Sequence, residues 1–323
     1  MIACLFTQYL TQIVSGSMGA MASSIIYSVA FRPPPSPSYS EDDVYFVGTN
    51  QKRIAVMLFV HKEYEIIRTK DAEELQNAVV QNTILYSHGN SVDLGMTAAY
   101  CMQVARETNC NVAVYDYVNY GLSEKCSCNE RDLYFAVSAA FLNLCQVAPR
   151  HNFYLYGKSL GTVPTVWLAS EIGKNTEQGN SRIQGVVLVS AIASGARTMC
   201  TVSMLPSGLQ HWVDTYFADS IDRITHVPYP MLFVHGKNDS VVPMRNLYDL
   251  HSRLTPEQSL QSKLVVFDAS HNDIEQLHST QFFEAVNSFM SSNISHISHD
   301  SRSTDGHNYS TGHEEIIKHN VDV

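Results

Sequence analysis

Short apolar runs alternate with longer amphipathic stretches through the middle of the chain. Such runs, rich in Val, Ile, Leu and aromatic residues, are typical of strands that are buried on both faces of a sheet. We expect strands at residues 53–59, 83–87, 111–116, 152–156, 184–189, 231–234 and 263–267, and helices at residues 94–108, 131–144, 162–172, 244–254 and 281–290. This alternation predicts an α/β fold with a mostly parallel central sheet and helices on both faces.

The alternation breaks at about residues 191–224, where we expect a short cap insertion within a single domain spanning residues 41–290. The insertion contains Trp212, Tyr216 and Phe217. These aromatic side chains would suit an acyl groove, and packing of the insertion onto the core explains them equally well. Because the insertion is short, we expect a shallow lid over an accessible cleft.

The first 31 residues contain no charged side chain and mix apolar residues with Gln, Thr, Ser and Gly. This composition makes a poor transmembrane helix and lacks the basic start of a signal peptide. We expect a membrane-contacting leader with Cys4 as a possible S-acylation site. A helix packed on the domain and a disordered leader are the alternatives.

Two further segments flank the domain. Residues 32–40 are rich in proline, which predicts an extended linker between the leader and the domain. Residues 291–323 are rich in Ser, His, Asn and Asp with little apolar content, which predicts a disordered tail.

Charge and cysteine content exclude several functional classes. A formal net charge of −10 argues against a nucleic-acid partner. The seven cysteines are odd in number and scattered, which indicates free thiols in a reducing compartment. No Cys or His pairs stand at the spacing of a metal site, so we expect neither a metal nor a cofactor.

The most informative motif is Gly157-Lys-Ser159-Leu-Gly161, which follows an apolar strand and leads directly into a helix. A strand-to-helix turn of this kind exposes the serine hydroxyl above the edge of the sheet. The two glycines avoid the Cβ collisions of such a tight turn. The motif therefore predicts Ser159 as a nucleophile.

The partners that a serine nucleophile needs follow in the order acid, then histidine. Asp239 follows the strand expected at 231–234, and His271 follows the strand expected at 263–267. Asp268 closes its strand, and Asp273 is better placed to cap the following helix. We expect His271 to act as general base and Asp239 to orient its ring.

A tetrahedral intermediate also needs two N–H donors. The backbone N–H of Leu160, directly after the nucleophile, is the first candidate. The second should come from the turn after the strand at 83–87, where we assign the N–H of Asn90, with Ser91 as the alternative.

Five stretches carry a resemblance to a known family: Ala30-Phe-Arg-Pro-Pro-Pro-Ser-Pro-Ser-Tyr39, Ile84-Leu-Tyr-Ser-His88-Gly-Asn-Ser-Val-Asp93-Leu-Gly95, Tyr115-Asp-Tyr117-Val-Asn-Tyr120-Gly-Leu-Ser123, Tyr156-Gly-Lys-Ser159-Leu-Gly-Thr-Val-Pro-Thr165 and Ser270-His271-Asn-Asp-Ile-Glu275. With these motifs the chain resembles the α/β-hydrolase domain-containing protein 17 family over roughly residues 31–290. The resemblance implies an α/β-hydrolase fold and Ser159, Asp239 and His271 as the triad. It also implies a membrane-tethered enzyme that removes palmitate from protein cysteines.

The chain departs from the family pattern at several positions. Cys4 stands alone where the family has a cluster of acylated cysteines. Asn119 replaces a glycine, Lys158 replaces a glutamine before the nucleophile, and Ser270 replaces a glycine before the histidine. None of these differences removes a predicted catalytic group, although Lys158 adds a charge beside the nucleophile.

We therefore expect a serine hydrolase of acyl thioesters or esters at the cytoplasmic face of a membrane. A palmitoyl-protein thioesterase acting on S-acylated proteins is the first hypothesis. A lysophospholipase or monoacylglycerol lipase acting on acyl lipids is the close alternative. A non-catalytic protein that uses the hydrolase fold to bind partners is the alternative from a different class.

Overall fold

The computed structural model describes residues 30–175, 182–199, 214 and 217–300. These residues build one nine-stranded sheet with strand order β1-β2-β5-β4-β6-β7-β8-β9 and with β3 beside β2. The strands are β1 (Tyr45–Gly48), β2 (Arg53–His61), β3 (Ile66–Thr69), β4 (Asn82–Ser87), β5 (Asn111–Tyr115), β6 (Asn152–Lys158), β7 (Ile183–Val189), β8 (Met231–Gly236) and β9 (Lys263–Phe267). All pairs from β5 through β9 are parallel, whereas β2 pairs antiparallel with β1, β3 and β5.

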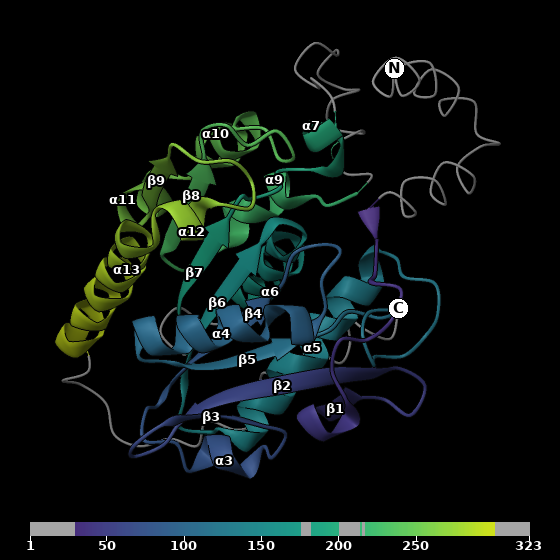
Figure 1. The fold of residues 1–323 in the computed structure, drawn as a ribbon. Coiled ribbons are helices and arrows are strands. Elements are labelled where there is room, and N and C mark those ends of the chain that lie inside the picture. The colour runs from purple at the N-terminus through teal and green to yellow at the C-terminus, as the bar shows by residue number, and fades with distance from the viewer. Residues whose placement is uncertain (1–29, 176–181, 200–213, 215–216, 301–323) are drawn as a thin grey trace.

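Helices cover both faces of this sheet (Figure 1). They are α3 (Glu73–Gln76), α4 (Leu94–Thr108), α5 (Glu130–Val147), α6 (Thr162–Asn175), α7 (Gly195–Met199), α9 (Ser220–Arg223), α10 (Arg245–Ser252), α11 (Pro256–Gln261), α12 (Ile274–Leu277) and α13 (Ser279–Asp300). One core joins α4 and α13 to the sheet, and a second core joins α5 and α6 to the opposite face. The predicted α/β fold with a mostly parallel, doubly covered sheet is confirmed.

Strand β2 shows why its apolar run is continuous. Ile54 and Val56 lie in the core under α5 and α6, whereas Ala55 and Met57 lie in the core under α4 and α13. Successive side chains of a strand point to opposite faces, so a strand between two helical layers has no position for a polar residue.

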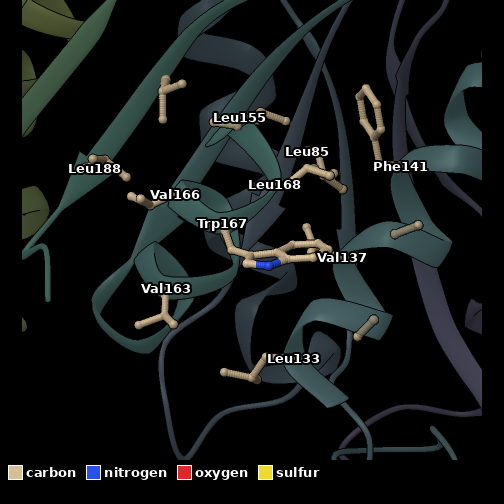
Figure 2. Close-up of a cluster of buried hydrophobic side chains, with 14 of the residues drawn as sticks. Leu85, Leu133, Val137, Phe141, Leu155, Val163, Val166, Trp167, Leu168 and Leu188 are labelled. Carbon is tan, nitrogen blue, oxygen red and sulfur yellow. The ribbon is translucent and has the colours of Figure 1, made fainter. Parts of the chain in front are cut away.

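Figure 2 shows the centre of the core under α5 and α6. Trp167 of α6 lies among apolar side chains of α5, including Leu133 and Val137. Its ring also stacks on Tyr134, with ring centroids 4.5 Å apart. Replacing a buried tryptophan by alanine typically costs about 3–5 kcal/mol of stability. This packing holds α6, the helix that follows Ser159, against the sheet.

Most predicted elements lie where the hydrophobic pattern placed them. The helix at 94–108 and the strand at 263–267 have the predicted bounds. The antiparallel strands β1 and β3 were not predicted, because each has only four residues and none of them is buried. Helix α13 continues to Asp300, beyond the boundary that composition placed at residue 290.

The cap insertion includes α7 and α9, while Trp212 and Tyr216 lie outside the described residues. Phe217 is buried, and its ring packs edge-on against Phe31 at 5.9 Å. Cys4 and the rest of residues 1–29 also lie outside the described part of the chain. In the part that the structure describes, no helix has the length and apolar character to cross a membrane.

Candidate active site

Ser159 lies at the carboxyl edge of the sheet, in a 3₁₀ turn (Ser159–Gly161) between β6 and α6. Its φ of +52° is in the left-handed region, which is unusual for a residue with a side chain. A Cβ on Gly157 would lie 2.6 Å from the Gly161 carbonyl oxygen, and a Cβ on Gly161 would lie 1.9 Å from the Ser87 carbonyl oxygen. Both glycines are therefore required by the close approach of this turn to its neighbours.

The structure brings Ser159, His271 and Asp239 together in one chain of hydrogen bonds. His271 Nε2 lies 3.0 Å from Ser159 Oγ, and His271 Nδ1 lies 2.7 Å from Asp239 Oδ2. A carboxylate only accepts hydrogen bonds, so Nδ1 carries the proton and Nε2 accepts from the serine hydroxyl. This tautomer is the one that a general base beside Ser159 requires.

The Asp239 carboxylate is held by its own turn as well as by His271. Its Oδ1 accepts from the N–H groups of Val241 at 2.9 Å and Val242 at 2.8 Å. Burial acts to raise the pKa of Asp239, but the hydrogen bond from His271 and the backbone hydrogen bond from Val242 hold that pKa below its usual value. The buried His235 ring contacts the Val242 carbonyl oxygen through Nε2 at 2.8 Å, which fixes the same turn. Asp239 therefore stays ionised under His271.

The two competing carboxylates serve the turns around the site. Asp268 Oδ1 accepts from the Asn238 side chain at 2.7 Å, which joins the turns that carry Asp239 and His271. Asp273 stands at the N-cap position of α12, as the sequence predicted, but it makes no side-chain cap. Its Oδ1 instead accepts from the Ser270 N–H at 2.6 Å and so fixes the turn that presents His271.

The loop after β4 lies directly beside Ser159. A Cβ on Gly89 would come within 3.7 Å of Ser159 Cβ. The N–H of Ser91, the alternative oxyanion donor, donates to Asn90 Oδ1 at 2.9 Å. The N–H of Asn90 itself donates to no acceptor among the described residues. Of the two predicted donors on this loop, Asn90 is therefore the one whose N–H remains available.

Sequence reasoning missed a buried ion pair beside the site. Lys158 Nζ lies 2.7 Å from Glu275 Oε1, and only 18% of the lysine side chain and 6% of the glutamate side chain are exposed. Lys158 directly precedes Ser159, and Glu275 lies on α12, one turn after His271. The pair therefore links the end of β6, directly before Ser159, to the segment that follows His271. The substitution of Lys158 for the family glutamine was the signal that pointed to it.

A second histidine–carboxylate pair joins the start of the loop after β4 to the end of β5. His88 Nε2 lies 3.1 Å from Asp116 Oδ1, and both side chains are fully buried. In the sequence His88 directly follows the strand expected at 83–87, and its pairing with Asp116 spans 28 residues. Across the described residues, no group of three or more His, Cys, Asp or Glu side chains is arranged to hold a metal ion.

Comparison with curated proteins finds several α/β-hydrolase domain-containing proteins among the relatives of this chain. The chain is 31% identical over 284 residues to α/β-hydrolase domain-containing protein aho-3 of Caenorhabditis elegans, covering 83% of this chain and 78% of the worm protein. It is 32% identical over 215 residues to human α/β-hydrolase domain-containing protein 17B, covering 66% of this chain and 67% of that protein. It is 34% identical over 212 residues to human protein 17C, covering 65% of this chain but only 58% of that protein. No protein-family profile matches the chain.

Solved structures support the same fold. The esterase Pf2001 of Pyrococcus furiosus superposes with a TM-score of 0.57 over 80% of this chain and 98% of its own, at 17% identity. Mouse α/β-hydrolase domain-containing protein 10 superposes with a TM-score of 0.52 over 77% of this chain and 98% of its own, at 14% identity. At these identities the likeness shows the fold alone, and it is an α/β-hydrolase fold. Together with the sequence relatives, it shows that the chain belongs to the α/β-hydrolase domain-containing protein 17 family.

Proposed function

We propose that the protein is a serine hydrolase that cleaves acyl thioesters or esters through an acyl-enzyme, with S-palmitoylated protein cysteines as its substrates. The observation that carries the proposal is the continuous hydrogen-bonded chain from Ser159 through His271 to Asp239. A serine hydroxyl is a poor nucleophile at neutral pH, and this arrangement supplies the base that it lacks.

In the proposed acylation step, Ser159 Oγ attacks the acyl carbonyl carbon while His271 Nε2 takes the hydroxyl proton. Asp239 stabilises the imidazolium that results. The carbonyl oxygen becomes an oxyanion, for which the backbone N–H groups of Leu160 and Asn90 are the donors. When the tetrahedral intermediate collapses, the bond to the leaving sulfur or oxygen breaks, and His271 gives its proton to that atom.

Deacylation repeats these steps with water in place of the hydroxyl. His271 takes a proton from water, the resulting hydroxide attacks the acyl-Ser159 ester, and the fatty acid leaves as Ser159 recovers its proton. A second negative charge close to the oxyanion would oppose both steps. In this site the nearby Glu275 carboxylate is paired with Lys158.

The palmitoyl-protein specificity rests on the resemblance of the chain motifs to the family described above. A long acyl chain suits a hydrolase of this kind, because each buried methylene contributes about 0.8 kcal/mol of binding. In the proposed setting the leader, with Cys4 as a lipidation site, holds the enzyme at the cytoplasmic face of a membrane. A single acyl chain gives only marginal membrane binding, so the apolar leader would have to insert as well. Removing residues 1–29 should therefore reduce sedimentation with lipid vesicles.

The proposal is tested by turnover with the full-length protein and a Ser159→Ala control. Release of fatty acid is measured from a palmitoyl-thioester peptide, a monoacylglycerol and a lysophospholipid at matched concentrations. We expect the highest kcat/KM with the thioester peptide and no turnover of any substrate by Ser159→Ala. Preference for either glyceride lipid would move the assignment to a lipase. A folded wild-type protein that hydrolyses none of the three would favour the non-catalytic binding protein.

A further inference from the structure

Residues 30–39, which we call the strap, lead from the leader into β1 and are coloured purple in Figure 1. The sequence predicted a linker here, yet two backbone groups of the strap bind one side chain of the site. The Arg32 N–H donates to Asn90 Oδ1 at 2.9 Å, and Asn90 Nδ2 donates to the Ala30 carbonyl oxygen at 2.9 Å. The side chain of Asn90, the predicted oxyanion donor, therefore binds the backbone of the strap through two hydrogen bonds.

The Asn90 carboxamide is used on both of its ends. Its Oδ1 also accepts from the Tyr120 hydroxyl at 2.6 Å and from the Ser91 N–H at 2.9 Å. The Arg32 N–H is shared with the Tyr120 hydroxyl at 3.1 Å. Ser91 has a φ of +62°, a conformation that residues with a side chain rarely adopt. A loop of this shape needs contacts outside itself to keep its geometry.

The far end of the strap is fixed on the first turn of α4. The Ser38 N–H donates to Asp93 Oδ2 at 2.7 Å, while Asp93 Oδ1 accepts from the Met96 N–H at 3.1 Å and so caps the helix. A Cβ on Gly95 would lie 2.4 Å from Ser38 Oγ. The strap therefore packs closely against the first turn of α4, and only a glycine at position 95 leaves room for Ser38.

The last strap residue reaches the base of the same loop. The Tyr39 hydroxyl donates to Asp116 and accepts from the Leu122 N–H at 2.8 Å. Asp116 also pairs with His88, which begins the His88-Gly-Asn90 turn. The strap thus holds this loop at its tip through Asn90 and at its base through Asp116.

We propose that the strap is a positioning element of the active site, which fixes the loop after β4 so that the Asn90 N–H points at the oxyanion. The inference rests on the proposed serine-hydrolase chemistry. Its geometric support is the closeness of this loop to Ser159, since a Cβ added at Gly89 would lie 3.7 Å from Ser159 Cβ. Strap residues act through Asn90 and do not touch the substrate.

The test removes one strap N–H without shortening the chain. Arg32→Pro in the full-length protein deletes the N–H that donates to Asn90, whereas the matched control Arg32→Ala keeps it. With a p-nitrophenyl ester, we expect Arg32→Pro to lower kcat by about 10- to 100-fold, less than or comparable to the loss of one oxyanion donor. We expect the KM of Arg32→Pro to stay within about two-fold of wild type, because strap residues do not contact the substrate. The kcat and the KM of Arg32→Ala should also both stay within about two-fold of wild type.

A second measurement separates positioning from general damage to the fold. An alkylboronic acid forms a tetrahedral adduct with an active serine, so its inhibition constant should weaken in parallel with kcat in Arg32→Pro, at an unchanged melting temperature. If Arg32→Pro does not fold, Tyr120→Phe replaces it, and we expect a decrease of kcat of about three- to ten-fold at constant KM. A folded variant with wild-type kcat and boronate affinity would overturn the inference while leaving the proposed function intact. A wild-type protein inactive on every ester would instead overturn the proposed function and the inference with it.

Discussion

Among the described residues, two histidine–aspartate pairs near the carboxyl edge of the sheet are joined by direct hydrogen bonds, and they differ in what faces the second ring nitrogen. In the pair of His271 and Asp239, that nitrogen meets the Ser159 hydroxyl. In the pair of His88 and Asp116, His88 Nδ1 lies 2.8 Å from the Gly89 carbonyl oxygen, which can only accept a hydrogen bond. The first ring is therefore placed to act as the proposed base toward the Ser159 hydroxyl, whereas the second ring joins two oxygen atoms.

The carboxylates of the two pairs also differ. Burial acts to raise the pKa of Asp239, but its hydrogen bonds from His271 and Val242 prevail and the pKa is lowered. For Asp116, burial prevails over its hydrogen bonds from His88 and Tyr39, and the pKa is raised. The same two residue types therefore have different surroundings in the two pairs. Asp239 accepts from the amides of its own turn, and the His271 side chain is partly exposed to solvent. The side chains of His88 and Asp116 are completely buried.

The largest effect should come from breaking the first pair. We expect His271→Gln to lower kcat by about 10⁴-fold or more, because no other side chain in the described part of the chain lies within hydrogen-bond distance of Ser159 Oγ. Glutamine keeps a side-chain N–H that can donate to the buried Asp239 carboxylate, so we expect only a modest change in the free energy of unfolding. Turnover of a p-nitrophenyl ester and a thermal melt, both run beside Ser159→Ala, check this. A variant with a tenth of wild-type activity would show that His271 is not the base.

Breaking the second pair should instead reduce stability. Asp116→Asn leaves the buried His88 and Tyr39 without their charged partner, and removing one member of a buried pair typically costs about 3–5 kcal/mol of unfolding free energy. Urea unfolding measures this loss. The kcat of the folded fraction should fall by less than about ten-fold, through displacement of the Asn90 loop. A loss of kcat as large as that of His271→Gln would place the second pair in the chemistry.

A third histidine sharpens the comparison because no carboxylate faces it. His151 is buried, its Nδ1 contacts the Thr83 hydroxyl at 2.9 Å, and burial together with Arg182 and Arg150 lowers its pKa to about 4. The unfolded chain binds a proton near pH 6.5, whereas the folded chain does so only near pH 4. Stability is therefore lost as pH falls through this window, by about 3 kcal/mol at about 1.4 kcal/mol per pKa unit.

The check for His151 is urea unfolding between pH 7 and pH 4 in wild type and in His151→Gln. The glutamine variant cannot gain the proton, so its stability should decline less over this window. Parallel pH profiles of the two proteins would contradict the assignment.

The smallest expected effect concerns the lysine–glutamate pair that ties the strand of Ser159 to the turn of His271. Lys158→Gln leaves the Glu275 carboxylate buried without its partner, and we expect kcat to fall by about ten-fold, or about 1.4 kcal/mol, as the turn loosens. The double variant Lys158→Gln/Glu275→Gln should recover most of this loss. Additive losses in the double-mutant cycle would show that the pair does not act as a unit.

The grouping of Ser159, Asp239 and His271 could be predicted from the sequence because each of these residues carries a local signal. Ser159 has its glycine-flanked turn, and Asp239 and His271 each follow an apolar strand, so the order of elements along the chain was sufficient to select them. The same local periodicity predicted the parallel strands and the helices between them.

The strap and the buried pairs could not be predicted, since they depend on contacts between distant positions. Arg32 and Asn90 are 58 residues apart, and Lys158 and Glu275 are 117 residues apart. Proline content predicted a linker at the strap, but composition does not show where such a segment binds. The choice between Asn90 and Ser91 as oxyanion donor likewise required the Asn90 side chain, which occupies the Ser91 N–H.

The most direct test of the central claim is to find which residue a fluorophosphonate modifies, by peptide mass spectrometry of the full-length protein. A fluorophosphonate reacts with a serine only where a base activates it, so Ser159 should be the modified residue in wild type. The label should be lost in His271→Gln and retained in Asp116→Asn. A folded wild-type protein that is not labelled, or a label on a different serine, would contradict the account.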